Sequence, residues 1–83
     1  MLTNLGKFIK EMLNERKSLH KFYNPMMGNL DIPKEDFKGS VVEEVMSLID
    51  LEMVEFEGTG YVWILSRECD AYIVSFMEYS IFC

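Results

Sequence analysis

Residues 54–65 read VEFEGTGYVWIL, and two apolar runs flank the Gly-Thr-Gly triplet at their centre. Large apolar side chains occupy every second position of both runs, which is the periodicity of a β-strand. Gly58 and Gly60 can adopt the positive φ that a tight hairpin loop requires. The segment therefore predicts a β-hairpin whose strands lie at about 52–57 and 61–66.

The C-terminal segment, residues 71–83, predicts a further strand. Ten of its thirteen residues are apolar, and many are β-branched or aromatic, which favours a strand. We expect this strand at about 71–78, antiparallel to the hairpin. A helix over the same residues stays open as an alternative. Because the apolar side chains fall on both faces, one face or edge is expected either to pair with a second copy of the chain or another partner, or to be capped by the C-terminal residues.

Two helices are expected before these strands. Apolar residues recur at helical spacing through residues 4–23, and Pro25 ends this helix because the residue before a proline disfavours the α region. Residues 25–32 are expected to form a connector. A second helix is expected at about 40–50, where the sequence SVVE matches the capping-box pattern. A helical turn at 33–38 can precede it.

The predicted elements form one small α+β domain over residues 1–83. In this domain the two N-terminal helices pack on a three-stranded antiparallel β-meander. With 49% hydrophobic residues, the chain has enough apolar side chains for a single core.

The charge of the chain argues against several classes of partner. Eight Lys and Arg stand against fourteen Asp and Glu, a formal net charge of −6. Residues 1–27 hold five bases and two acids, whereas residues 28–83 hold three bases and twelve acids. An acidic chain is repelled by nucleic acid and by anionic membranes, so neither is expected as a partner. A protein with a basic surface is the expected partner.

No residue pattern predicts catalysis, a cofactor or a metal site. His20 is the only histidine, and no Ser-His-Asp or Cys-His arrangement can be assembled around it. Cys69 and Cys83 do not form a metal-binding motif and are expected to be reduced thiols. No stretch has the roughly 20 apolar residues that span a bilayer, and no secretory signal is evident, so a cytoplasmic protein is expected. If the protein is viral, that cytoplasm is the host cell's.

Three sets of residues are candidate binding sites. Carboxylates exposed on the second helix and the hairpin predict an acidic face, made of Glu43, Glu44, Glu52, Glu55 and Glu57. Two aromatic residues of the hairpin are either core residues or interface anchors, and the sequence leaves both open: Tyr61 and Trp63. A basic ridge lies along the polar side of the first helix and is formed by Lys7, Lys10, Lys17 and Lys21.

Residues 33–66 place a helix directly before a glycine-turned hairpin, and this order is similar to the C-terminal part of a winged-helix domain. That resemblance implies a DNA-binding regulator, which can be dimeric. The helix and the hairpin offer glutamates where such a protein needs Lys or Arg. In its size, its acidity and its lack of a catalytic motif, the chain is similar to small phage-encoded inhibitors that imitate nucleic acid.

We therefore expect a non-enzymatic protein-binding module, most concretely a small acidic inhibitor or regulator that docks on a basic site of a partner. Self-association through the C-terminal apolar segment is a further expectation. The alternative is the winged-helix-type, DNA-binding regulator.

Overall fold

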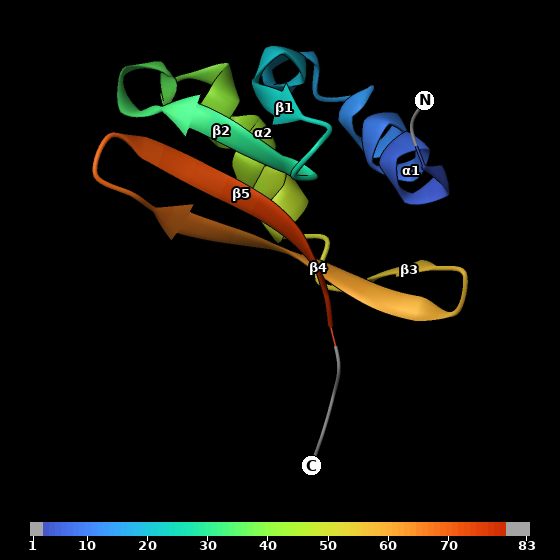
Figure 1. Ribbon diagram of the computed structural model, residues 1–83. Helices are drawn as coiled ribbons and strands as arrows, with labels where there is room; N and C mark the ends of the chain where they lie inside the picture. Colours follow the sequence, from blue (N-terminus) through green and yellow to red (C-terminus); the bar gives the residue numbers. More distant parts are fainter. Residues whose placement is uncertain (1–2, 80–83) are drawn as a thin grey trace.

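The two longest strands, β4 (Thr59–Arg67) and β5 (Ala71–Glu78), pair antiparallel over seven residues each. A computed structural model describes residues 3–79, and the pair lies within a five-stranded antiparallel sheet of order β1-β2-β5-β4-β3 (Figure 1). The remaining elements are α1 (Asn4–Leu13), η1 (Lys17–Phe22), β1 (Tyr23–Asn24), β2 (Asn29–Pro33), η2 (Lys34–Asp36), α2 (Ser40–Ile49) and β3 (Val54–Phe56). The α+β class is confirmed, but the three-stranded meander is wrong in detail.

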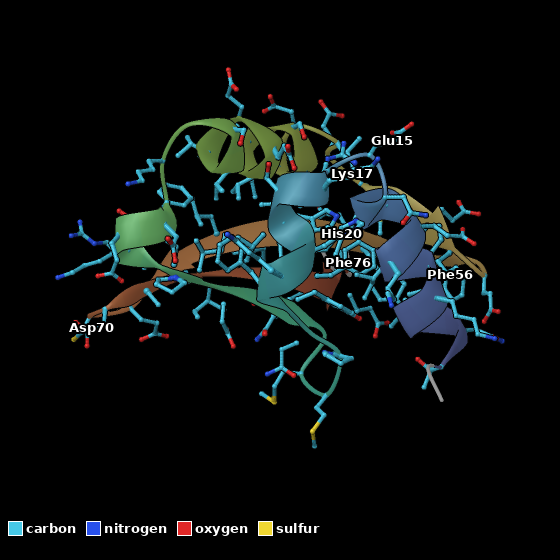
Figure 2. The ribbon with its side chains drawn as sticks, turned by 90° about the horizontal axis from the view of Figure 1, so that it is seen from above. Glu15, Lys17, His20, Phe56, Asp70 and Phe76 are labelled. Atoms are coloured by element: carbon cyan, nitrogen blue, oxygen red, sulfur yellow. The ribbon has the colours of Figure 1, made fainter. Side chains whose placement is uncertain are left out.

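Successive side chains of a strand point to opposite faces, so the register assigns each residue to a face. Leu30 of β2, Val74 of β5 and Leu65 of β4 lie side by side on one face, and Trp63 lies beside Phe76. The helical elements α1, η1 and α2 cover this face, and η1 lies between α1 and α2 (Figure 2). The residues buried between helices and sheet form the core: Ile9, Leu13, Leu19, Phe22, Leu30, Ile32, Val45, Leu48, Trp63 and Val74.

The predicted helix over residues 4–23 is wrong, because the chain breaks it after Leu13 and continues as the short 3₁₀ helix η1. Arg16 donates from Nη1 to the carbonyl oxygen of Met12 at 2.7 Å, and His20 donates from Nε2 to the carbonyl oxygen of Leu13. These side chains add hydrogen bonds to the last carbonyl groups of α1, which have no i+4 N–H partner in the helix. An unbroken 20-residue helix would be about 30 Å long, whereas the two short pieces can both lie on the sheet.

The second helix is confirmed as α2, but its start differs from the expected capping box. Gly39 is the N-cap and makes no side-chain hydrogen bond to the helix. The hydroxyl of Ser40 instead lies 2.9 Å from the hydroxyl of Ser18, which links α2 to η1. The helical turn expected at 33–38 is present as η2.

The predicted hairpin is confirmed, but its turn consists of Glu57 and Gly58, with φ of 51° and 81°. Two consecutive positive φ values are typical of a type I′ turn. The positive φ expected at Gly60 is wrong, since this residue lies in β4 opposite Glu55. A Cβ at Gly60 would lie 2.7 Å from Sδ of Met53, so the glycine makes room for that side chain.

The connector expected at 25–32 contains most of an additional hairpin, formed by β1 and β2. Asn24 accepts hydrogen bonds at Oδ1 from the backbone N–H groups of Met26 and Met27, at 3.0 and 3.3 Å, and Gly28 adopts a φ of 71°. These contacts turn the chain back so that β2 pairs along β5. The sequence does not predict β2, because its apolar and polar residues alternate over only five positions.

Replacing Leu30 by alanine tests the place of β2 in the core. This side chain is fully buried, so Leu30→Ala should lower the free energy of unfolding by about 2–5 kcal/mol in urea denaturation. The neighbouring Asp31 is exposed, and Asp31→Ala should change it by no more than about 0.5 kcal/mol. Equal effects of the two substitutions would show that the segment is a surface connector.

Candidate functional site

The face of the sheet that the helices leave uncovered carries exposed apolar side chains. The register brings Val62 beside Met77, and Ile64 lies two residues further along β4 on the same face. Ile64 is 40% exposed and Met77 is 49% exposed. Figure 1 shows α1, η1 and α2 on the other side of the sheet. We call this surface the open face, and its apolar residues are Met53, Val62, Ile64, Ile73, Met77 and Tyr79.

One end of the open face is hollowed. A hollow of about 330 Å³ is lined by Met53, Val62, Tyr79 and Glu52. The backbone N–H of Tyr79 donates to the carbonyl oxygen of Gly60 at 2.7 Å, which extends the pairing of β5 with β4 by one residue. Met53 fills the space above Gly60 but remains 52% exposed. The hollow is therefore lined by Val62 of β4 and by residues that directly precede β3 or follow β5.

The charges on the open face are all negative. Asp31 lies opposite Ile73, and Glu55 lies opposite Gly60, so both side chains share the open face. Both are exposed, as is Glu52 beside the hollow. Within residues 3–79, no strand position of this face holds Lys or Arg. The open face is thus an apolar surface with carboxylates at its margin.

The predicted acidic face is divided by the fold. Glu52 and Glu55 belong to the open face, and Glu57 lies in the hairpin turn beside it. Glu43 and Glu44 lie on α2, on the other side of the sheet. Glu44 accepts a hydrogen bond from the backbone N–H of Ser18 at 3.1 Å, so it is also a structural contact between α2 and η1.

The two candidate anchors, Tyr61 and Trp63, lie on the covered face. Trp63 is 4% exposed and belongs to the core, with its ring centroid 4.7 Å from that of Phe76. Tyr61 is half-buried and stacks on the same ring at 4.9 Å. Phe76 in turn lies 6.3 Å from Phe8 of α1. The structure thus places both residues in an aromatic cluster under α1, away from the open face.

The basic ridge is exposed but is divided by the break after α1. Lys7 and Lys10 lie on α1, whereas Lys17 and Lys21 lie on η1. The ammonium of Lys21 lies 5.1 Å from the centroid of the Phe22 ring. The break therefore separates the four lysines into two pairs on different helices.

No group of three or more His, Cys, Asp or Glu side chains that could hold a metal ion occurs in the part of the chain that the structure describes. No helix among the same residues is long and apolar enough to cross a bilayer. Cys69 is a free, exposed thiol in the turn between β4 and β5. Cys83 lies outside the described residues.

The strand periodicity already indicated part of the open face. Residues 61–65 are apolar at every position, so a strand there has to present apolar side chains to both faces. Which face stays uncovered follows only from the packing of the helices. No sequence pattern places Met53 or Tyr79 on the open face, because their place there depends on contacts with Gly60 in the folded chain.

No protein-family model matches the chain, and neither the curated proteins nor the solved structures include a significant match. The candidate site therefore stands on its own geometry.

Paired substitutions on α2 test the structural contact of Glu44. Glu44→Ala removes the acceptor of the Ser18 N–H and should lower the free energy of unfolding by about 1 kcal/mol. Glu43 is exposed on the adjacent position of the same helix, so Glu43→Ala should change it by less than about 0.5 kcal/mol. Chemical denaturation measures both, and an equal loss would contradict the contact.

Proposed function

We propose that this protein is a non-enzymatic protein-binding module, which docks through its open face on a partner that is apolar at the centre and basic at the rim. The observation that carries the proposal is the composition of the open face: exposed apolar side chains at the centre, and carboxylates as the charged groups at the margin. Contiguous exposed apolar surface commonly marks an interaction site on a small protein.

The side chains of the open face suit a protein interface. Methionine and aromatic residues are enriched at interfaces, and Met53, Met77 and Tyr79 are all exposed there. The unbranched side chain of methionine adapts to irregular partner surfaces. Strands β4 and β5 hold Val62, Ile64 and Met77 on a paired ladder, so little backbone ordering is needed there on binding.

The charge of the open face favours a different protein over a second copy of the chain. In a two-fold dimer, each surface meets its own equivalent. The carboxylates of Asp31, Glu52 and Glu55 would then approach the carboxylates of the second copy. Within residues 3–79, no strand position of this face holds a Lys or Arg that could pair with them. Like charges brought together at an interface oppose association. A partner with Lys or Arg at the rim removes this repulsion.

Over residues 71–75, strand β5 also offers no free edge for the self-association expected of the C-terminal segment. It pairs with β2 on one side and with β4 on the other. Residues 80–83 of that segment lie outside the described residues. The side chains of Ile73 and Met77 reach a partner only across the open face.

The proposal includes a mode of action in which the protein inhibits or regulates a nucleic-acid-handling partner. Carboxylates at fixed positions on a sheet can occupy sites where Lys and Arg bind phosphates. The net charge of −6 would speed the encounter with such a basic surface. Glu52 and Glu55 are the carboxylates placed to do so beside an apolar contact.

Two charge-matched double variants test which acidic surface binds. The open-face pair is Glu52→Lys with Glu55→Lys, and the control pair is Glu11→Lys with Glu43→Lys, at exposed positions on α1 and α2. Each purified variant serves as bait in a low-salt lysate of host cells. The wild type and the control pair should retain the same basic partner protein. The open-face pair should lose it, because rim charges govern encounter and complementarity.

Equal loss of the partner by both pairs would show that only the overall charge matters, and retention by both would exclude the open face. Recovery of the bait alone, with a dimer mass in solution, would favour self-association. Retention of DNA at low salt, lost when Lys7, Lys10, Lys17 and Lys21 become glutamate, would favour the DNA-binding alternative.

A neutral substitution tests the apolar part of the open face. Ile64→Thr keeps a β-branched residue in the strand but removes apolar contact, and it should weaken partner binding about tenfold. Met26 is 94% exposed in the β1–β2 turn, and Met26→Thr serves as the control without effect. Isothermal titration with the captured partner measures both, and an unchanged affinity of Ile64→Thr would contradict apolar docking.

A further inference from the structure

The second half of β4 forms an edge of the sheet along which no described strand lies. Strand β3 pairs with β4 only as far as Tyr61, whereas β4 continues to Arg67 and stays paired with β5 over this length. In Figure 1, β5 lies along one side of this half of β4, drawn in brown, and no described element lies along its other side. We call residues 64–67, on this side of the strand, the β4 edge.

The hydrogen bonds of β4 show which backbone groups point to this edge. Successive residues of an antiparallel strand direct their N–H and C=O groups to opposite sides. The C=O of Gly60 accepts from the residue after β5, and the N–H of Glu68 donates to the first residue of β5. Even-numbered residues of β4 therefore face β5, and the backbone groups of Leu65 and Arg67 face the β4 edge. On that side, neither residue has a backbone hydrogen bond to any part of residues 3–79.

A partner can reach the β4 edge from solvent. Ile64 is 40% exposed, Ser66 and Arg67 are also exposed, and Leu65 is half-buried. Trp63, the next residue back along the strand, is only 4% exposed, so its backbone groups take no part. A strand edge with free donors and acceptors is a template for another extended backbone.

Helix α2 has three neighbouring stripes of residues, each with the helical spacing of i, i+4 and i+7. The middle stripe packs in the core and consists of Val41, Val45 and Leu48. One flanking stripe contacts η1 or the residue just before it and consists of Ser40, Glu44 and Ser47. The opposite flanking stripe, which we call the α2 flank, consists of Val42, Met46 and Ile49.

The α2 flank faces the side of the sheet on which the β4 edge lies. Helix η1 packs against β2, whereas α2 packs against β4, on the other side of β5. The flank of α2 that points away from η1 therefore points toward the outer side of β4. Met46 is 39% exposed there, and Val42 and Ile49 are half-buried. The strand thus offers free backbone groups, and the helix above it offers apolar side chains.

We propose that an extended segment of another protein pairs with the β4 edge as a sixth strand and packs apolar side chains against the α2 flank. The backbone groups of Leu65 and Arg67 hold the main chain of the segment. Since successive side chains of a strand point to opposite faces, every second residue of the segment faces the α2 flank and is apolar. This site uses other side chains than the open face and goes beyond the function proposed for it.

Charge favours a segment of a different protein over a second copy of this chain. Glu43 of α2 and Asp50 at its C-cap are exposed next to the α2 flank. If two β4 edges paired about a two-fold axis, the two α2 flanks would meet and bring these carboxylates together. A segment that carries Lys or Arg beside its apolar residues is attracted by the same carboxylates.

Short random peptides displayed on phage and selected on the intact protein supply probes for the site. Enriched peptides should be apolar at alternate positions and contain Lys or Arg. A synthetic copy of the most enriched peptide should slow hydrogen exchange of the Leu65 and Arg67 amides at least tenfold by NMR. The amides of Ile64 and Ser66, which already pair with β5, should change little. A failure to enrich any such peptide, or protection at other residues only, would overturn the proposal.

Two charge-matched variants test the α2 flank. Met46→Lys places an ammonium among the apolar side chains and should weaken binding of the selected peptide at least tenfold. Met26 is 94% exposed in the β1–β2 turn, so Met26→Lys makes the same change of net charge away from the site and should have little effect. Equal weakening by both variants would show that only the overall charge matters and would contradict the site.

Proline and alanine at one position test the backbone contact. Arg67→Pro removes the N–H that points to the β4 edge and should abolish peptide binding, whereas Arg67→Ala keeps this N–H and should retain it. Both variants lose the same charge, so charge cannot cause the difference. Equal binding by the two variants would contradict pairing at the edge.

Thermal midpoints show whether the proline variants remain folded. Ser66→Pro removes an N–H that pairs with β5 and should lower the midpoint much more than Arg67→Pro does. An equal loss would mean that the Arg67 N–H serves the fold, which would overturn the proposal. The open-face pair of lysine substitutions, Glu52→Lys with Glu55→Lys, should leave peptide binding intact, so the two sites succeed or fail separately.

Discussion

Strand β5 is apolar on both of its faces, and the helices of the chain lie on only one of them. Val74 and Phe76 alternate with Ile73 and Met77 along the strand. The first two pack with Leu30, Leu65 and Trp63 under the helices. Burial of this apolar surface is the main favourable contribution to folding. The other two remain on the open face, so the same alternation that builds the core also creates the candidate site.

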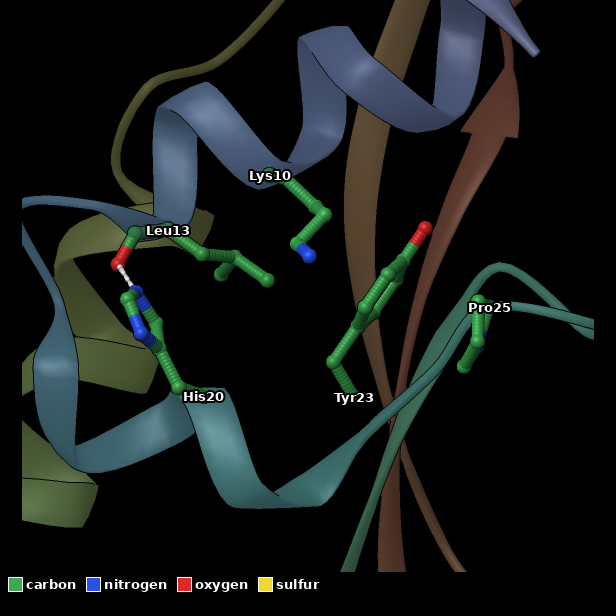
Figure 3. A pocket seen from close by; sticks show the side chains of 5 residues that line it. All are labelled: Lys10, Leu13, His20, Tyr23 and Pro25. Carbon is green, nitrogen blue, oxygen red and sulfur yellow. Dashed lines mark hydrogen bonds between the residues drawn. The ribbon is translucent and has the colours of Figure 1, made fainter. Parts of the chain in front are cut away.

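The covering of one face explains why the N-terminal segment is broken. Ile9 and Leu13 of α1, and Leu19 and Phe22 of η1, all reach the core. Two short helices place these side chains over different strands, and Arg16 links the end of α1 to Ser47 of α2 at 2.7 Å. The same break encloses a pocket of about 370 Å³ between α1, η1 and the β1–β2 hairpin (Figure 3). The open face and this pocket therefore both follow from how a short chain covers a wide sheet.

The sequence predicted the elements with sustained periodicity and missed those that depend on tertiary contacts. The hairpin of β3 and β4, the strand β5 and the helix α2 follow from local patterns. Strand β2 was missed because NLDIP alternates over too few residues to distinguish it from a loop. The end of α1 depends on the contact of Arg16 with the distant Ser47 and on the contact of His20 with Leu13 in the folded chain. The acidic face was predicted from exposure alone, which could not show that the sheet separates Glu43 from Glu55.

The central claim is that one face of the sheet is covered and the other is open to solvent. Methyl NMR in the presence of a soluble paramagnetic agent measures this directly, residue by residue. The account predicts strong broadening of the Ile64 and Met77 methyl signals and protection of those of Ile32 and Val74, which are fully buried. If the Ile64 and Met77 methyls are as protected as the Val74 methyls, the open face does not exist in solution and the account is contradicted.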